Sequence, residues 1–349
     1  MMDFPIIKIL FFATFAFIFA MSLTPLLTNF LYKYKLGKKI RNNGLTPIYT
    51  ELHAHKEGTP TMGGVLIWGT VLIFILMFSV LSNWWPDSLW SKLNFLSRPE
   101  TLLPLGALII TALIGLVDDW LDVRGKGVIG GGGLKLQHRL LIYTFIATAG
   151  ALWFYFKLNW TIFHIPFLGN FEIGAWYIPV FIFMIVATAF SVNETDGLDG
   201  LAGGTLLISF AAYGVIAYSL GRYNLATFCA VIIGALLAFL WFNIPPARFY
   251  LGDTGAMSLG VTLGIIAMLT NSSLLLIFIG LVFLIESLSV IIQILSKKLF
   301  GRKVFLSSPI HHHYQALGWP EAKVVMRFWV VAAIGASIGL IIFLIDLRI

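Results

Sequence analysis

Five short polar segments interrupt an otherwise apolar chain and carry most of its acidic and imidazole groups. They comprise residues 117–119, 193–200, 251–255, 311–313 and the stretch around Lys56. Each follows an odd-numbered hydrophobic run, and segments that follow odd-numbered membrane spans lie at the same face. We therefore expect carboxylates, imidazoles and a lysine from distant loops to converge there, as the groups of an active site do.

The composition indicates a membrane protein. Hydrophobic residues make up 59% of the 349 residues and charged residues only 11%, against roughly 25% in soluble domains. Repeated apolar runs joined by short loops favour a single polytopic domain over residues 1–349 rather than two soluble domains. Cys229 is the only cysteine, which excludes a disulfide within the chain and a cysteine-based metal site.

Ten apolar runs approach the length of about 20 residues that a helix needs to cross hydrocarbon. An open strand in lipid would leave backbone groups unpaired, and the alternating pattern of a barrel is missing. We therefore expect an all-α integral membrane protein, a bundle of ten transmembrane helices with both termini at one face. The runs cover about residues 9–31, 62–81, 102–117, 140–156, 176–192, 201–220, 225–242, 256–269, 274–295 and 324–345.

Basic residues are distributed unevenly between the two sets of loops. Most Lys and Arg residues fall after the odd-numbered runs, which predicts that the face carrying the polar motifs is cytoplasmic. Membrane topology explains most of this bias, although a net charge of +7 would also attract nucleotide diphosphates and anionic lipid head groups. Nucleic acid is not expected as a partner, because no recognition module is evident.

The carboxylates allow both a functional and a structural interpretation. Asp118 and Asp119 directly follow an apolar run, where buried charge is costly without a compensating cation, but they could also be solvated loop acids. Asn193, Asp196 and Asp199 are spaced by three, which would place them on one face of a helix; capping and turn formation is the alternative.

Two further acids complete the acidic set. Asp253 precedes the eighth run, where it would be a natural helix N-cap, and that structural interpretation is the stronger one for this residue alone. Glu286 lies inside the ninth run, and an ionisable residue within a span usually faces a site or a polar cavity.

Several carboxylates beside basic residues and without thiols are typical of magnesium sites that also bind phosphates. A divalent cation bridging a diphosphate stabilises the charge that develops during phosphoryl transfer, so we expect that reaction class. His311, His312 and His313 raise zinc as an alternative, but three consecutive histidines cannot easily converge on one ion. An imidazole at this position could instead donate to a phosphate or move a proton.

The order of the motifs resembles the phospho-N-acetylmuramoyl-pentapeptide transferases, a branch of the polyprenyl-phosphate N-acetylhexosamine-1-phosphate transferase superfamily. The resemblance extends over nearly the whole chain. The acidic motifs are common to the superfamily, whereas the triple histidine followed by Trp-Pro-Glu indicates the muramoyl-pentapeptide branch. The matching segments are residues 59–64, 118–119, 193–202, 251–255, 309–314 and 318–321.

This resemblance implies a fold of ten spans in the bacterial inner (cytoplasmic) membrane and an activity. The family transfers phospho-N-acetylmuramoyl-pentapeptide from its UDP carrier to undecaprenyl phosphate with Mg²⁺, and releases UMP. It implies that Asp253 binds the metal, with Asp196 as a second ligand, that Asp118 is the base, and that Asp119 supports the cluster. His311 would contact the reacting phosphates, and His312 and His313 would do so or shape the loop. The residues implied for the nucleotide pocket are Lys56, Asn193, Asp196, Gly197, Leu198, Asp199, Asn243 and Tyr250.

Three departures from the family pattern are visible. Gln315 stands where Glu is frequent, Tyr250 stands where Phe is common, and the segment after Asp119 is less basic than expected. In that segment Lys135 and Arg139 are both candidates for contacting phosphate. Pairing of the spans into a homodimer is open, because no interfacial motif requires it.

The sequence leaves alternatives in both mechanism and function. The lipid phosphate could displace UMP directly, which we favour, or a carboxylate could first form a phospho-enzyme. An intramembrane prenyltransferase also uses acidic clusters and magnesium but does not need the histidine loop. A transporter would place its acids near the midplane rather than at one face. An N-acetylglucosamine-1-phosphate transferase would differ only in its sugar donor.

Overall fold

The computed structural model describes residues 3–37, 56–125 and 133–348, and its architecture is almost entirely helical. Lys38, Lys39, Arg41 and segment 126–132 of the glycine-rich loop lie outside the described residues. The longer helices are α1 (Asp3–Lys33), α3 (Gly64–Trp84), α5 (Leu102–Arg124), α6 (Leu136–Lys157), α7 (Tyr177–Thr195), α8 (Leu201–Ser219), α9 (Tyr223–Asn243), α10 (Gly252–Leu269), α12 (Leu281–Phe300) and α14 (Glu321–Asp346).

Shorter elements connect these helices. They are α4 (Leu89–Leu93), β1 (Ile162–Ile165), β2 (Gly169–Glu172), η2 (Gly174–Trp176), η3 (Ser273–Leu275), α11 (Leu276–Ile279) and α13 (Ile310–Ala316). The two strands form an antiparallel hairpin between α6 and α7, which hydropathy did not predict because neither strand crosses the bilayer.

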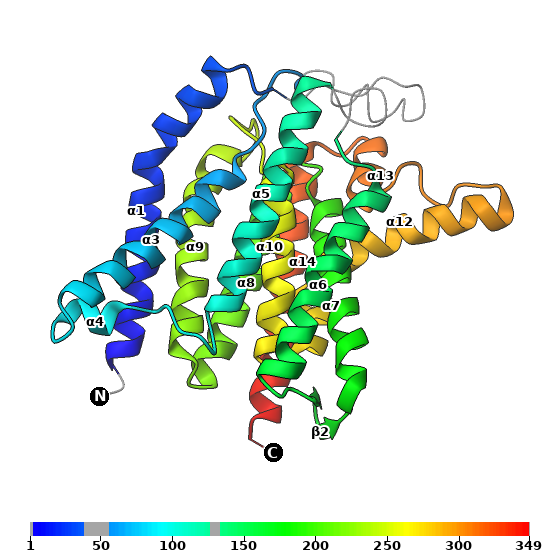
Figure 1. The fold of residues 1–349 in the computed structure, drawn as a ribbon. Helices are drawn as coiled ribbons and strands as arrows, with labels where there is room; N and C mark the ends of the chain where they lie inside the picture. Colours follow the sequence, from blue (N-terminus) through cyan, green and yellow to red (C-terminus); the bar gives the residue numbers. More distant parts are fainter. Residues whose placement is uncertain (1–2, 38–55, 126–132, 349) are drawn as a thin grey trace.

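Within the described ranges, nine helices are long and apolar enough to cross a membrane, or ten if a bent pair counts as one span. This confirms the predicted bundle of transmembrane helices. The ninth predicted run is the exception to a straight span: Ser273–Ile279 and Leu281–Phe300 meet at an angle of 85°. Gly280 lies at this break, and the outer part of α12 projects sideways from the bundle (Figure 1).

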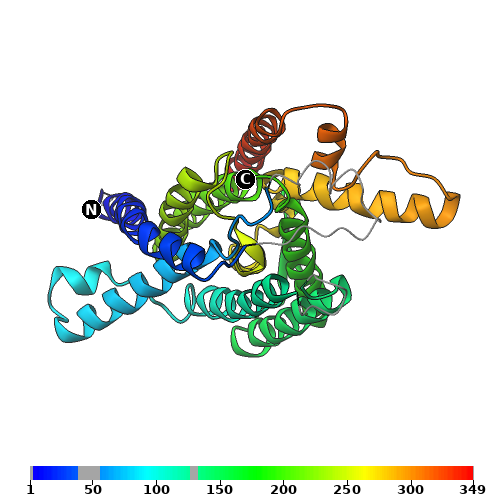
Figure 2. The same cartoon turned by 90° about the horizontal axis from the view of Figure 1, so that it is seen from above.

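Helix α10 forms the centre of the bundle. In the most apolar stretch of 18 residues of α10, 94% of the residues are buried, against 22–28% in the corresponding stretches of α1, α6 and α14. Helix α10 packs against α5, α7 and α3. Small residues permit this close packing: a Cβ atom added at Gly115 would collide with the α10 backbone at Asp253 and Thr254. The first turn of α10 is therefore held directly against α5. Seen from above, α10 lies near the centre of the bundle (Figure 2).

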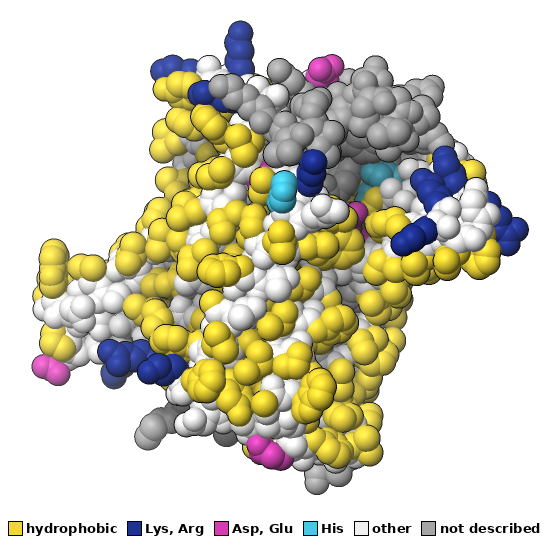
Figure 3. Space-filling view, turned by 45° about the vertical axis from the view of Figure 1, so that its right-hand side comes forward, with side chains coloured by type: hydrophobic (Ala, Val, Ile, Leu, Met, Phe, Trp, Pro, Cys, Tyr) yellow, Lys and Arg dark blue, Asp and Glu magenta, His cyan; other side chains and the backbone are white. Residues whose placement is uncertain are grey.

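The two ends of the bundle differ in what they contain. Both termini lie at the lower end, as expected for an even number of spans, whereas the ends of α5 and α7 and the starts of α6 and α10 lie at the upper end (Figure 1). Hydrophobic side chains cover much of the flank, and basic side chains lie near the upper end, at the tip of α12 and at the lower left of the view (Figure 3). The flank therefore presents an apolar surface of the kind that contacts lipid acyl chains.

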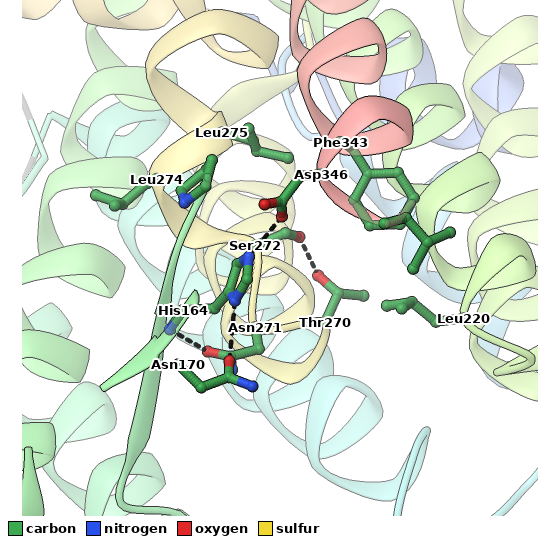
Figure 4. A pocket seen from close by; sticks show the side chains of 12 residues that line it. His164, Asn170, Leu220, Thr270, Asn271, Ser272, Leu274, Leu275, Phe343 and Asp346 are labelled. Atoms are coloured by element: carbon green, nitrogen blue, oxygen red, sulfur yellow. Dashed lines mark hydrogen bonds and ion pairs between the residues drawn. The ribbon is translucent and has the colours of Figure 1, made fainter. Parts of the chain in front are cut away.

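The hairpin is fastened to the end of α14. His164 Nε2 lies 2.5 Å from Asp346 Oδ2, and the Phe167 N–H donates to Asp346 Oδ1 over 2.7 Å. The His164 N–H also donates to Asn271 Oδ1, beside a cavity of about 300 Å³ (Figure 4). These contacts lie at the end of the bundle that holds the termini, so the cavity is remote from the acidic motifs.

Candidate active site

The last two turns of α5 carry the first pair of acids. Asp118 has an exposed fraction of 0%, so it is not the solvated loop acid that the sequence allowed. Its Oδ1 accepts from the Leu134 N–H over 2.5 Å, and its Oδ2 lies 3.0 Å from Arg139 Nε. Asp118 thus holds the start of α6 and faces a guanidinium within the protein.

Asp119 caps the N-terminus of α10, the role that the sequence suggested for Asp253. Its Oδ1 accepts from the N–H of Asp253 over 3.0 Å, and its Oδ2 accepts from the N–H of Thr254 over 3.0 Å. Thr61 Oγ1 donates to the same carboxylate over 3.1 Å. A carboxylate at a helix N-terminus satisfies free N–H groups and complements the helix dipole. The prediction that Asp253 is the N-cap is therefore wrong: α5 supplies the cap.

Because Asp119 occupies those N–H groups, the Asp253 carboxylate is free to point elsewhere. Asp253 Oδ2 lies 2.8 Å from Arg139 Nη2, and Asp253 Oδ1 accepts from Asn193 Nδ2 over 2.8 Å. Arg139 Nη1 also donates to Asn193 Oδ1 over 2.8 Å. The Arg139 guanidinium thus lies between Asp118 and Asp253. The two carboxylates, which come from separate helices, together neutralise its positive charge.

The segment 193–200 does not continue as a helix. Helix α7 ends at Thr195, Asp196 follows it in a non-helical conformation, and α8 begins at Leu201. Asn193, Asp196 and Asp199 therefore do not share one helical face, and the alternative of a turn holds for this segment. The turn directs these side chains to different partners: Asn193 contacts Asp253, whereas Asp199 contacts Lys56.

The side chain of Lys56 is only 10% exposed. Lys56 Nζ lies 2.6 Å from Asp199 Oδ1 and 2.5 Å from Glu321 Oε1, and the Glu321 oxygen also accepts from the Asp199 N–H. Lys56 is therefore a partly buried, paired charge and not a solvated one. Glu321 was noted only as part of the Trp-Pro-Glu motif; its place at the start of α14 gave no indication that it would meet Lys56.

The other residues expected in the nucleotide pocket surround this ion pair. Asn243 Oδ1 accepts from the Gly200 N–H over 2.9 Å, and Tyr250 Oη donates to the backbone oxygen of Lys56 over 3.4 Å. Leu198 is buried in a small apolar cluster with Val324. Asn243 and Leu198 therefore shape the turn from inside the protein, whereas half-buried Tyr250 keeps its ring at the site.

The three histidines have three different sets of contacts. His311 Nδ1 lies 2.9 Å from Glu286 Oε2, His312 Nδ1 lies 2.9 Å from Gln315 Oε1, and His313 Nδ1 accepts from the Leu306 N–H over 3.2 Å. The three rings therefore contact three different partners and do not converge on one point. Among the described residues, no group of three His, Cys, Asp or Glu side chains is arranged to hold a metal ion.

Burial also determines the charge of the first two histidines. Burial, with a smaller contribution from Lys56, lowers the pKa of His311 to about 3. Burial, together with His311, lowers the pKa of His312 well below its usual value. Both rings are therefore neutral near pH 7, so His311 is an uncharged imidazole with one N–H group and one acceptor nitrogen.

The donor set fits magnesium better than a metal held by protein alone. Mg²⁺ typically takes one or two carboxylates and completes its shell with water and substrate phosphates. Asp253 and Asp118 are hard oxygen donors that already face one cationic group, and Asp196 directly follows α7 one turn beyond Asn193. Arg139, which the sequence left open beside Lys135, is the basic residue that lies among these acids.

A methyl group at Gly197 tests how closely the turn approaches His311. A Cβ added there would collide with His311 Nε2, so Gly197→Ala must displace the ring. We expect kcat/KM to fall by about 10²-fold, because a displacement near 1 Å within a catalytic site costs that much. Gly106→Ala is the matched control, since its Cβ meets nothing within 4 Å. Equal kinetics for both variants would show that the ring position is unimportant.

Comparison with known proteins supports one family. The glycosyl transferase family 4 model matches residues 101–271, which include Asp118, Asp119 and Asp253, and the phospho-N-acetylmuramoyl-pentapeptide-transferase signature 1 matches residues 56–67. The matched segments thus contain Lys56 and the acids that face Arg139.

Full-length relatives agree with these matches. The chain is 40% identical to the phospho-N-acetylmuramoyl-pentapeptide-transferase of Anoxybacillus flavithermus over 96% of this chain and 97% of that protein. It is 38% identical to the enzyme of the same name from Chloroflexus aggregans, over 95% and 88%, and 38% identical to that from Bacillus anthracis, over 94% and 95%. The chain therefore belongs to the phospho-N-acetylmuramoyl-pentapeptide transferase family, multi-pass membrane enzymes of peptidoglycan synthesis.

Proposed function

We propose that the acids facing Arg139 and the ion-paired Lys56 at the upper end of the bundle bring together UDP-N-acetylmuramoyl-pentapeptide and undecaprenyl phosphate. The reaction transfers the phospho-sugar to the lipid, releases UMP and gives the first lipid-linked peptidoglycan precursor. One observation carries the proposal: Asp118 and Asp253 face a common cationic group at one end of an apolar bundle. A charged phosphate and a lipid tail can meet only at such a boundary.

The nucleotide is assigned to the turn between α7 and α8. Gly197 and Leu198 shape this turn, Tyr250 offers a ring for stacking on uracil, and Lys56 offers a positive charge. Lys56 Nζ is held by Asp199 and Glu321, so little side-chain entropy remains to be lost when it contacts a ligand. These contacts support binding of the UDP half of the donor.

The reacting phosphates are assigned to the acidic cluster. Asp118 removes the proton of the lipid phosphate, whose oxygen then attacks the sugar-proximal phosphorus of the donor. A bond forms from that phosphorus to the lipid phosphate oxygen, and its bond to the oxygen of UMP breaks. Arg139 lies beside the position of the developing charge, and Asn193 orients both Arg139 and Asp253.

Asp253, with Asp196 as the second candidate ligand, would hold Mg²⁺. The bound ion would neutralise negative charge on the diphosphate during transfer. Asp119 fixes the first turn of α10 and so places the Asp253 carboxylate. His311 completes this end of the site from α13, while His312 and His313 hold their loop through Gln315 and Leu306.

The active site is proposed to face the cytoplasm, because most basic residues follow the odd-numbered spans. This orientation gives the site access to a soluble UDP donor. The same face admits the phosphate of a lipid whose tail lies along the apolar flank. A homodimer of this bundle is compatible with the large exposed apolar surface, and the reaction as written needs one chain only.

The test is UMP release by the purified protein in lipid nanodiscs with Mg²⁺ and undecaprenyl phosphate. We expect UMP with UDP-N-acetylmuramoyl-pentapeptide and none with UDP-N-acetylglucosamine. Release from the second donor alone would assign the chain to the N-acetylglucosamine-1-phosphate branch. A prenylated product that still contains the UDP-sugar would indicate prenyl transfer. Exchange of labelled donor across vesicle membranes without release of UMP would indicate transport.

A further inference from the structure

Glu286 is a buried acid that the reaction described above does not use. It lies on α12, two turns after the break at Gly280, with an exposed fraction of 0%. Its Oε2 is 2.9 Å from His311 Nδ1 and 3.5 Å from the backbone nitrogen of His311. Glu286 therefore contacts both the ring and the backbone of the one histidine that lies against the nucleotide turn.

Packing alone does not account for this side chain. Within the described part of the chain, Glu286 Oε1 is buried without a hydrogen-bond partner. A buried polar atom without a partner costs stability, whereas a leucine would fill similar space without that cost. The carboxyl group must therefore be explained by what its other oxygen does, and that oxygen contacts His311.

The opposite side of the His311 ring faces the proposed active site. His311 Nε2 is buried and has no hydrogen-bond partner among the described residues, and it is the atom nearest to a Cβ built at Gly197. The neutral ring carries one proton, and Glu286 Oε2 is an acceptor next to Nδ1. A proton on Nδ1 leaves Nε2 with a lone pair directed toward the nucleotide turn.

We propose that Glu286 is a positioning residue that keeps the His311 proton on Nδ1 and presents the Nε2 lone pair to the substrate as a hydrogen-bond acceptor. Nε2 can then accept a hydrogen bond from a hydroxyl group of the bound donor, while Asp118 remains the base that takes the proton of the lipid phosphate. This role rests on the proposed function, because it concerns the same site.

The first test measures the tautomer without any substrate. Protein with ¹⁵N-labelled histidine in nanodiscs is compared with His311→Asn to identify the His311 nitrogens by NMR. We expect a protonated Nδ1 and an unprotonated Nε2 in the wild type, retention in Glu286→Gln, whose amide oxygen can still accept, and a mixture in Glu286→Leu. A protonated Nε2 in the wild type, or an unchanged tautomer in Glu286→Leu, would overturn the assignment.

The second test asks whether Glu286 acts through His311. Glu286→Leu should lower kcat by about 10²-fold, with a smaller change in KM. Loss of a residue that orients a functional side chain typically costs about 10–100-fold in activity, and this case lies at the upper end. In the double variant with His311→Asn, the Glu286→Leu change should have almost no additional effect on kcat, because residues that act as a unit are not additive. A full additional loss would mean that Glu286 acts independently.

Gln293→Leu is the matched control for that cycle. Gln293 is also a buried polar residue on α12, but it accepts from the N–H groups of Val304 and Phe305 and does not contact His311. Its effect should add to that of His311→Asn. The two proposals fail separately: no UMP from the wild type would contradict the reaction, whereas the tautomer assignment stands or falls on the spectrum of the resting protein.

Discussion

Replacing Asp253 by Asn is expected to lower kcat by about 10³-fold while leaving the helical bundle folded. The substitution keeps the shape of the side chain but removes the charge that faces Arg139 and that would bind Mg²⁺. Loss of one group that stabilises transition-state charge costs about 10²–10³ in kcat, and loss of a metal ligand places this case at the upper end. The measurement is UMP release at saturating concentrations of both substrates, with thermal unfolding of each variant in the same nanodiscs.

Asp346→Asn provides the matched control. Asp346 is also a paired acid at a helix end, with a side-chain exposed fraction of 13% against 17% for Asp253, but it binds His164 at the opposite end of the bundle. We expect near wild-type kcat for Asp346→Asn even if its melting temperature falls. Equal losses in both variants would indicate that stability, and not charge at the active site, controls turnover.

Asp118→Asn is expected to lower kcat by a comparable factor with little change in the KM for the UDP donor. Asn can still accept the Leu134 N–H, so the start of α6 keeps its anchor, but it can neither take a proton nor compensate Arg139. General-base catalysis alone contributes about 10²–10⁴-fold. The measurement is kcat and KM for each substrate, with Asp122→Asn on the same helix as comparison.

The same variant bears on the order of bond formation. In direct displacement, no phospho-sugar becomes attached to the protein when the lipid is omitted. Radiolabelled donor incubated with Mg²⁺ and without undecaprenyl phosphate should therefore leave no label on the wild-type chain. Label that is retained after denaturation and lost in Asp118→Asn would establish a phospho-enzyme at that residue.

Much of the fold followed from hydropathy and parity. Run length predicted the spans, because in lipid each backbone group must be bonded within its own helix. Parity predicted that the polar groups at the end of α5, at the end of α7 and at the start of α10 lie together, and the structure places Asp118, Asn193 and Asp253 around Arg139. Such convergence depends only on which ends of the helices meet, and the order of runs determines this.

Finer features depended on contacts that local sequence does not encode. Asp253 has the sequence of an N-cap, yet Asp119 on another helix takes the N–H groups of α10. The spacing of Asp196 and Asp199 suits a helix, but α7 ends at Thr195. The bend of 85° at Gly280 could not be read from a continuous apolar run either. In each case tertiary packing overrides a local preference.

The pairing of Lys56 with Glu321 shows the same limit. The two residues are separated by most of the chain, and each alone fits a solvated charge or a helix terminus. They meet because α14 begins beside the turn that carries Asp199. By contrast, Glu286 was singled out by the sequence, because an acid inside a span has few structural explanations.

Binding of Mn²⁺, followed by electron paramagnetic resonance with the UDP donor present and the lipid absent, tests the central claim most directly. If Asp253 and its neighbours form one metal and phosphate site, the wild type and Asp346→Asn will bind the ion with similar affinity, and Asp253→Asn will bind it at least tenfold more weakly, on the order expected for loss of a charged ligand. Unchanged affinity in Asp253→Asn would contradict the account, whatever happens to turnover.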